Sequence, residues 1–472
     1  MESILNLESN KEKCQKFTPI HIVNDMLDLV GYSENLMGKK VLENSFGSGN
    51  ILKEIVKRYI EDAINKNVGL FEIAKGLEFD VFGVELDKQL FTQCISELDD
   101  LIKRYNLPPV RWSLFNEDTL QWRNPNQFQF IIGNPPYISY RHLDENNRIK
   151  LRQKYLSCSK GKFDYCYAFI ECATNMLADD GKLVQLIPSN IYKNVFADTL
   201  RDILLPKLVS VYDYPGMKMF GSTLTSSSVF LYDNQYLEEN VVYRNISENY
   251  SASILKKDLK DKWIFGKRVD IKRKCVRFGD IFHASTAVAT LFNKAFLLDE
   301  SSDTIEMELV KKAASPRSLS AKKEMNIIFP YYYDDNGILQ KYSEKEFEEK
   351  FPNAFKHLYK FKNELLNRDS DSKAKWFEYG RSQALKHLRQ EKLLISTIIT
   401  NEVKVYLLEN EEIPYSGIYI TVKDERYMLE DALRILRGKE FLQYVMDIGI
   451  SVSGNSKRIT SKDINNFRFW EE

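Results

Sequence analysis

Between about residues 19 and 235, short apolar runs alternate with amphipathic stretches. Such alternation of strands and helices predicts an α/β fold with a largely parallel sheet and helices on both faces. After about residue 240 the rhythm changes to strand-like pieces, loops and a long polar helical region at 343–368. We therefore predict two domains, 1–240 and 241–472. The predicted strands are 39–44, 81–87, 128–134 and 181–190, and the predicted helices are 51–64, 88–105, 164–177 and 196–205.

The composition is that of an ordinary globular chain, and its 472 residues are enough for two or three domains with sizeable cores. No apolar run approaches the ~18 residues that cross a membrane. The start, MESILNLESNKEK, lacks the basic and apolar regions of a secretory signal. The six cysteines form no CxxC pair and the five histidines are scattered. We expect a cytoplasmic protein with reduced thiols, no membrane segment and no metal site.

The net charge of zero hides an asymmetry between the halves. Residues 1–240 carry 27 basic and 32 acidic side chains, and residues 241–472 carry 40 and 35. The basic residues are dense in GKRVDIKRKCVRFGD (266–280) and KKAASPRSLSAKK (311–323). A charge run is most often a solvated face, and the alternative is that the second half binds a polyanion.

Glycines and acidic residues follow the predicted strands. A Gly47-Ser-Gly49 turn joins the first strand to its helix, which alone is a weak signal because tight turns commonly need glycine. Glu43, Glu85 and Asp118, however, stand at the ends of three successive strands. Ligands of open α/β sheets bind at these ends, where acids can accept hydrogen bonds from ribose hydroxyls and an adenine amino group. Because no P-loop lysine is present, we expect a nucleoside with an uncharged tail.

The stretch FIIGNPPYISY ends the predicted strand at 128–134, the fourth when the strand before Asp118 is counted, with Asn134, Pro135, Pro136 and Tyr137. These residues suit methylation of a planar amino group, whose delocalised lone pair makes it a poor nucleophile. Acceptors at the Asn134 side chain and the Pro135 carbonyl would draw the nitrogen toward a tetrahedral shape, and the fixed φ of both prolines holds them in place before reaction. The Tyr137 ring would stack on the flat substrate. The electrophile would be a sulfonium methyl, so positioning is most of the catalysis.

Taken in order, these motifs resemble the gamma class of S-adenosylmethionine-dependent DNA amino-methyltransferases, typified by the TaqI-type adenine methyltransferases. The resemblance covers the first half, including KFTPIHIVNDML (16–27), the stretch 160–192 and MKMFGSTLTSSSVFLY (217–232). It implies a Rossmann-like catalytic domain with a mixed, mostly parallel sheet and a C-terminal α+β target-recognition domain. The loop at 44–46 reads Asn-Ser-Phe where the family usually has Pro-Ala-Cys.

The resemblance also implies roles for individual residues. The implied cofactor is S-adenosylmethionine, with S-adenosylhomocysteine as product and no metal. Asn134–Tyr137 match the catalytic tetrapeptide, and Phe220 is the candidate for a second aromatic ring against the flipped base, with a core phenylalanine as the alternative. The implied cofactor-binding residues are Thr18, Pro19, Glu43, Gly47, Gly49, Glu85 and Asp118.

The second half would hold the duplex while the target base is extruded. Lysine and arginine contacts to phosphates would set affinity and register, and side chains in the grooves would read the sequence. The stretches 277–298, 376–385, 413–422 and 453–467 resemble pieces of the target-recognition domain of this class. Arg381, Ser382 and Gln383 are equally plausible as DNA contacts and as a structural helix start. The remaining candidates for DNA contacts are Lys267, Arg268, Lys272 and Arg273.

Several alternative functions are compatible with these motifs. Motifs of the NPPY type also occur in enzymes that methylate cytosine N4, protein glutamine or ribosomal RNA guanine, and a DNA-binding protein with a relic methylase fold is the non-enzymatic alternative. The basic second half favours double-stranded DNA and its adenine N6 atom as the substrate. We expect a monomer. We also expect no fused nuclease, since this would need another domain ahead of the methylase and only about 16 residues precede Thr18. A separate restriction endonuclease in the same cell is a candidate partner.

Overall fold

The computed structural model describes residues 18–214, 226–265, 275–298, 305–453 and 455–470. The chain divides into two compact units, residues 1–266 and 267–472, and each is described by itself. Some predicted site residues lie outside the described residues: Phe220, Lys267, Arg268, Lys272 and Arg273.

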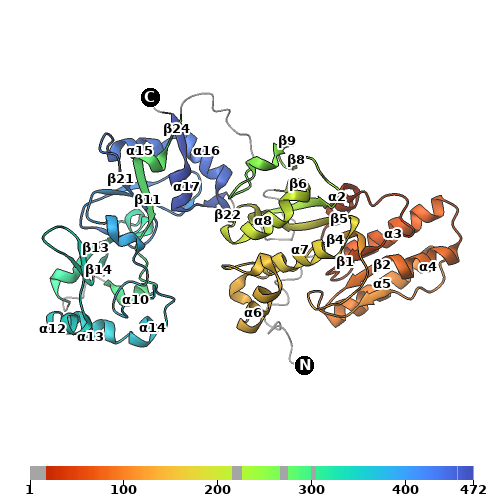
Figure 1. The fold of residues 1–472 in the computed structure, drawn as a ribbon, viewed down its shortest axis with the longest axis horizontal. Helices are drawn as coiled ribbons and strands as arrows, with labels where there is room; N and C mark the ends of the chain where they lie inside the picture. The colour runs from red at the N-terminus through yellow and green to blue at the C-terminus, as the bar shows by residue number, and fades with distance from the viewer. Residues whose placement is uncertain (1–17, 215–225, 266–274, 299–304, 454, 471–472) are drawn as a thin grey trace. The chain divides into compact units, whose positions relative to one another are not determined.

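The first unit is built on a nine-stranded sheet with the order β3-β2-β1-β4-β5-β7-β6-β8-β9 (Figure 1). Strands β3, β2, β1, β4 and β5 run parallel, whereas β7 lies antiparallel between β5 and β6. The predicted α/β class with a mixed, mostly parallel sheet is therefore confirmed. The strands are β1 (Val41–Glu43), β2 (Val81–Val84), β3 (Ser113–Phe115), β4 (Phe128–Gly133), β5 (Leu177–Pro188), β6 (Leu208–Tyr214), β7 (Ser227–Asp233), β8 (Asn240–Asn245) and β9 (Tyr250–Leu255).

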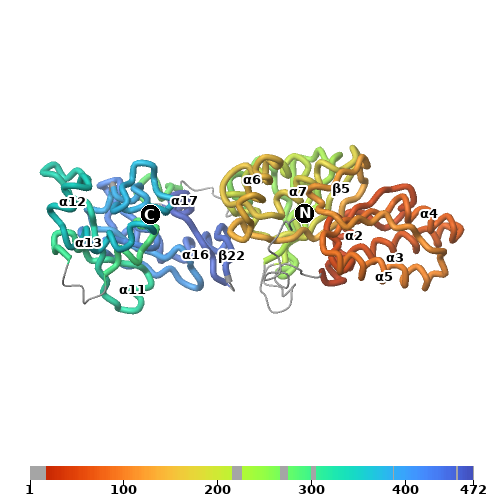
Figure 2. The backbone as a smooth tube through the Cα atoms, turned by 90° about the horizontal axis from the view of Figure 1, so that it is seen from below, coloured from red at the N-terminus to blue at the C-terminus, as the bar shows by residue number. Residues whose placement is uncertain are grey.

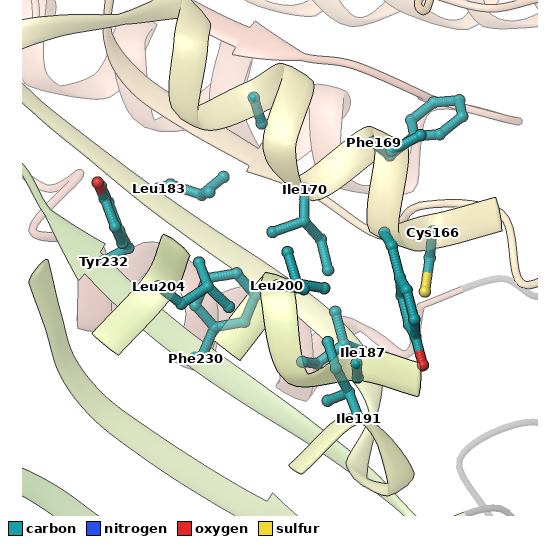
Figure 3. Packing of buried hydrophobic residues seen from close by; sticks show 14 of the residues in the cluster. Cys166, Phe169, Ile170, Leu183, Ile187, Ile191, Leu200, Leu204, Phe230 and Tyr232 are labelled. Atoms are coloured by element: carbon teal, nitrogen blue, oxygen red, sulfur yellow. The ribbon is translucent and has the colours of Figure 1, made fainter. Parts of the chain in front are cut away.

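Helices cover both faces of this sheet because successive strand residues point to opposite sides. Val41 packs into a cluster with α2, α3, α4 and α5, whereas Leu42 packs into a second cluster with α6, α7 and α8. Figure 3 shows the second cluster, where Ile170 of α7, Leu200 of α8 and Phe230 of β7 pack together. The helices are α2 (Ile20–Val30), α3 (Asn50–Asn65), α4 (Leu70–Asp80), α5 (Lys88–Arg104), α6 (Glu145–Lys154), α7 (Tyr165–Met176) and α8 (Asp198–Leu204).

All eight predicted strands and helices of the first half are present, with ends displaced by a few residues. Helix α4 was not predicted. It packs closely on α3, where a Cβ at Gly76 would lie 2.1 Å from the Tyr59 hydroxyl oxygen, and that hydroxyl donates to Asp80 Oδ2 at 2.6 Å. This packing involves residues that local periodicity does not connect.

The division between the units differs from the predicted boundary after residue 240. Strand β8 pairs in parallel with β6, and β9 pairs antiparallel with β8, so both extend the first sheet. Trp263 and Phe265 also pack into the core of the first unit. The first unit therefore includes about 25 residues that the sequence pattern placed in the second domain.

The second unit combines small sheets with short helices around its own core (Figures 1 and 2). In place of one helical region at 343–368 stand three short helices, the second beginning at Pro352. Its sheets have the orders β11-β21-β17-β19, β12-β14-β13-β20, β18-β23-β22, β10-β24 and β15-β16. In the described residues no helix is long and apolar enough to span a bilayer.

The strands of this unit are β10 (Cys275–Arg277), β11 (Phe282–Thr286), β12 (Leu297–Leu298), β13 (Val310–Ala314), β14 (Asn326–Ile328), β15 (Tyr331–Tyr333), β16 (Leu339–Lys341), β17 (Lys392–Ile395), β18 (Ile398–Ile399), β19 (Val405–Leu408), β20 (Ile413–Pro414), β21 (Ile418–Val422), β22 (Ile450–Ser453), β23 (Ser456–Arg458) and β24 (Arg468–Trp470). The helices are α9 (Phe278–Ile281), α10 (Asn293–Phe296), α11 (Pro316–Ser320), α12 (Glu344–Lys350), α13 (Pro352–Tyr359), α14 (Lys362–Leu366), α15 (Leu429–Arg437), α16 (Lys439–Ile448) and α17 (Ser461–Asn466).

Candidate active site

Three predicted site residues meet where β1, β2 and β4 end, because these strands are parallel neighbours. Glu43 is the last residue of β1, Glu85 follows β2 and Asn134 follows β4. The Gly47 N–H donates to Glu85 Oε2 at 2.8 Å, which ties the glycine loop to the end of β2. The structure therefore brings the predicted acids and the predicted catalytic motif to one edge of the sheet.

The loop between β1 and α3 needs glycine at two positions. Gly47 and Gly49 have φ of +54° and +78°, in the left-handed region that residues with a Cβ rarely adopt. At Gly49 a Cβ would also lie 2.3 Å from Cys94 Sγ, whereas at Gly47 nothing lies within 4 Å. The loop therefore packs tightly at one glycine and leaves open space at the other.

Glu43 is buried, with an exposed fraction of 2%. Burial, and then the negative charge of Glu85, raise the pKa of Glu43 well above its usual range. Its Oε2 atom has no hydrogen-bond partner among the described residues. A buried acid with an unpaired oxygen at a strand end can accept a hydrogen bond from a ligand.

Glu85 and Asp118 are partly buried and already accept hydrogen bonds from their own loops. Glu85 accepts from the backbone N–H groups of Gly47 and Asp87, and burial raises its pKa. Asp118 lies three residues beyond the end of β3 and accepts from the N–H of Leu120 at 3.0 Å. Because two carboxylate oxygens offer about four acceptor positions, both acids can still accept from a nucleoside.

Asn134 is held by contacts from distant parts of the chain. Its Nδ2 atom donates to Thr18 Oγ1 at 3.1 Å, and its backbone carbonyl accepts from Ser45 Oγ at 3.2 Å. Thr18 is buried just before Pro19, which caps the start of α2, and its carbonyl accepts a hydrogen bond from Asn50 of α3. The predicted N-terminal motif thus touches the predicted catalytic amide directly.

Tyr137 turns its hydroxyl back toward the motif. The hydroxyl lies within hydrogen-bonding distance of both Asn134 Oδ1 and the Leu186 carbonyl oxygen. Burial, followed by nearby Cys166 and Asp164, raises the pKa of Tyr137 well above its usual range, so the phenol is neutral. Burial also raises the pKa of Asp164 to about 6.

Several residues that shape this edge were not singled out from the sequence. Asn44 and Gln185 are both fully buried, and Gln185 Nε2 donates to Asn44 Oδ1 at 3.4 Å. Thr119 Oγ1 donates to the Asn44 carbonyl at 2.5 Å. A Cβ at Gly133 would lie 2.9 Å from Asn44 Oδ1. Asn44 and Ser45 are two of the positions that depart from the family pattern, and that departure was the available signal.

The side chains at the strand ends have the hydrogen-bond acceptors that S-adenosylmethionine requires. Glu43 has an unpaired buried oxygen, Glu85 and Asp118 have spare acceptor positions, and the loop at Gly47 is open. Among the described residues, no group of three or more His, Cys, Asp or Glu side chains could hold a metal ion.

A cleft of about 530 Å³ lies beside Thr18, between α3 and α5. Its lining carries both charge signs, and Lys53 is paired with Glu97 across it. Most of its lining comes from α3 and α5, and it reaches Thr18, which contacts Asn134 of the candidate site. The predicted acids Glu43, Glu85 and Asp118 are absent from this lining, so we assign the site to the sheet edge.

Of the predicted contact residues in the described part of the second unit, Arg381 and Ser382 are engaged within the chain. Arg381 donates to Asp369 at 2.9 Å and to Asp371 at 3.1 Å, and Ser382 donates to Asp371 through its backbone and its hydroxyl. Gln383 begins a 3₁₀ turn, which agrees with the structural helix start given as the alternative for this segment. The Arg381 side chain remains 40% exposed.

Comparison with known proteins finds a family model that is similar to the central part of the first unit. Residues 36–220 match the model described as Eco57I restriction-modification methylase. The relatives of this chain include proteins named as a modification methylase and as type II methyltransferases. The modification methylase CviBIII of Paramecium bursaria Chlorella virus NC1A is 29% identical over 43% of this chain and 45% of its own length. M.BstVI of Geobacillus stearothermophilus is 24% identical over 55% of this chain and 48% of its own length. The chain thus spans about half the length of these relatives.

Proteins that match over more of this chain have lower sequence identity to it. The type II methyltransferase M.HindII of Haemophilus influenzae is 21% identical over 91% of this chain and 82% of its own length. Among solved structures, the type IIL restriction-modification enzyme MmeI in complex with DNA has a TM-score of 0.61 at 13% identity, covering 95% of this chain and 64% of that one. This similarity concerns the fold alone, agrees with the predicted α/β fold, and carries no residue roles.

Proposed function

We propose that this chain transfers a methyl group from S-adenosylmethionine to the N6 amino group of an adenine flipped out of duplex DNA. The observation that carries the proposal is the meeting of Glu43, Glu85 and Asn134 at the ends of three neighbouring parallel strands. The names of the methyltransferase relatives support the same reaction class, and MmeI, which is similar in fold, was solved in complex with DNA.

We assign each residue of the candidate site a role in the proposed reaction. Glu43, Glu85 and Asp118 bind the cofactor, which supplies a sulfonium methyl as electrophile. Asn134 Oδ1 and the Pro135 carbonyl accept from the target amino group and aim its lone pair. Such preorganised acceptors act without reorganisation during the reaction, and one is worth ~10²–10³ in rate.

The second unit is proposed to hold the duplex. Its part of the sequence carries the basic excess, and phosphate contacts supply most of the affinity of such proteins for DNA. A separate restriction endonuclease as partner, a monomeric state and a cytoplasmic location belong to the same proposal. Arg381 stays a candidate contact, because its guanidinium is partly exposed and keeps N–H donors beyond its two ion pairs.

The test is expression in a host that lacks DNA methylation, followed by mapping of modified bases across the host genome. N6-methyladenine at one recurring sequence is expected. N4-methylcytosine would keep the reaction class and replace the target base. A genome without modified bases, from a protein that binds S-adenosylmethionine, would move the substrate to RNA or protein.

A further inference from the structure

The Tyr137 hydroxyl has two acceptors within reach, Asn134 Oδ1 and the Leu186 carbonyl oxygen. A phenol carries one proton, so it donates fully to only one acceptor at a time. Because burial raises the pKa of Tyr137, the hydroxyl keeps this proton at neutral pH. The hydroxyl is therefore a single donor between two acceptors.

One of these acceptors is the atom that methyl transfer requires. Asn134 Oδ1 faces the tyrosine because Nδ2 donates to Thr18 on the other side of the amide, and Ser45 holds the backbone carbonyl. An oxygen that already accepts a close hydroxyl contact is a weaker acceptor for a second donor, since its charge is shared and its surroundings are crowded. The target amino group and the Tyr137 hydroxyl thus compete for Asn134.

We propose that the Tyr137 hydroxyl is a placeholder for the target amino group. It donates to Asn134 Oδ1 while the base pocket is empty, and rotation of its O–H bond turns the proton to the Leu186 carbonyl when the amino group enters. This inference rests on the proposed amino-methyltransferase function. It assigns the hydroxyl a part separate from the ring, which stacks on the base.

The placeholder has a cost for binding. A polar atom that loses its donor in a buried site is unfavourable, and the hydroxyl removes that penalty in the empty pocket. It also reduces what the target amino group gains on entry, by the extent to which the hydroxyl's bond to Asn134 is stronger than its bond to the Leu186 carbonyl. Removing only the hydroxyl, in Tyr137→Phe, should therefore strengthen binding of a base that carries an amino group.

The test compares two duplexes that contain the mapped recognition sequence. One carries the natural target base, and the other carries the same base without its exocyclic amino group. Dissociation constants are measured with S-adenosylhomocysteine present, so that no methyl transfer occurs. Tyr137→Phe should bind the natural duplex about two- to tenfold more tightly than wild type, the size of one net hydrogen bond. Its affinity for the duplex without the amino group should be unchanged.

Tyr379→Phe is the matched control. Tyr379 is buried in the second unit, and its hydroxyl donates to the Ile328 carbonyl at 2.8 Å. Its loss should leave the ratio of the two dissociation constants unchanged. Turnover gives a second measurement: in Tyr137→Phe the KM for DNA should fall by about the same factor as the dissociation constant of the natural duplex.

The outcomes separate the two proposals. A Tyr137→Phe variant that binds both duplexes equally more weakly, or with no change in their ratio, overturns the placeholder. A loss of kcat without tighter binding also overturns it, and makes the hydroxyl a group that orients Asn134. Absence of methyl transfer by the wild type would instead refute the proposed function.

Discussion

Replacing Gly49 by alanine should destabilise the first unit strongly. The new Cβ would lie 2.3 Å from Cys94 Sγ and 3.4 Å from Cys94 Cβ, and Cys94 is fully buried. A residue with a Cβ in the left-handed region costs ~1–2 kcal/mol, and forcing extra atoms into a packed core costs ~1–3 kcal/mol. We expect a loss of about 2–5 kcal/mol in the free energy of unfolding.

Gly47 offers a control in the same loop. Its φ of +54° is also left-handed, but a Cβ there would meet nothing within 4 Å. Gly47→Ala should therefore lose only the backbone part, about 1–2 kcal/mol. Urea denaturation of the ligand-free protein, followed by circular dichroism, measures both variants.

A double-mutant cycle isolates the steric part. In a Cys94→Ala background the sulfur is gone, so Gly49→Ala should cost no more than Gly47→Ala costs in the wild type. Residues in contact typically show coupling of ~0.5–3 kcal/mol in such cycles. If Gly49→Ala cost the same with and without the sulfur, close packing of the loop on α5 would not explain the glycine.

Four further predictions concern binding, rate, domains and pH. Glu85→Ala should lose S-adenosylmethionine binding in calorimetry, and unchanged affinity would remove Glu85 from the site. Asn134→Ala should lower turnover by ~10²–10³ with little change in DNA affinity. Residues 1–266 alone should bind the cofactor but not the duplex. For the full chain, the logarithm of the DNA association constant should fall by about 0.9 per log unit of salt concentration for each phosphate neutralised. Burial raises the pKa of Glu43 above 4.5, so the folded ligand-free protein binds the carboxyl proton more tightly than the unfolded chain does. The free energy of unfolding should therefore fall as the pH rises from 4.5 through the raised pKa. Glu43→Gln should remove this slope and unfold at a higher temperature than wild type at pH 8.

The sheet of the first unit could be predicted because each strand is a short apolar run followed by a turn signal. β1, β2 and β4 end within a few residues of the predicted positions, and their parallel order places Glu43, Glu85 and Asn134 at one edge. Here local pattern and global fold agree, which is the condition under which sequence patterns are informative.

The contacts around Asn134 could not be predicted in the same way. Thr18 lies 116 residues away from it, and Ser45 lies 89 residues away. Hydrophobic periodicity carries no information on contacts at these sequence separations. The sequence pattern could therefore place Thr18 and Ser45 near the candidate site but could not predict their hydrogen bonds with Asn134. The boundary between the units was misplaced for a similar reason, since β8 and β9 join the first sheet through pairings that local composition does not reveal.

The candidate site also concentrates buried polar atoms that the chain leaves unpaired. Among the described residues, Glu43 Oε2, Asn44 Nδ2 and Gln185 Oε1 are buried without a hydrogen-bond partner. Each such atom costs ~1–3 kcal/mol in a folded protein. Glu43 ends β1, Asn44 follows it, and Gln185 of β5 pairs with Gly133 of β4. Replacement of these side chains by apolar ones would relieve the cost. Their retention at one sheet edge is more consistent with selection for binding a polar ligand than with selection for stability, as the raised pKa of Glu43 also indicates.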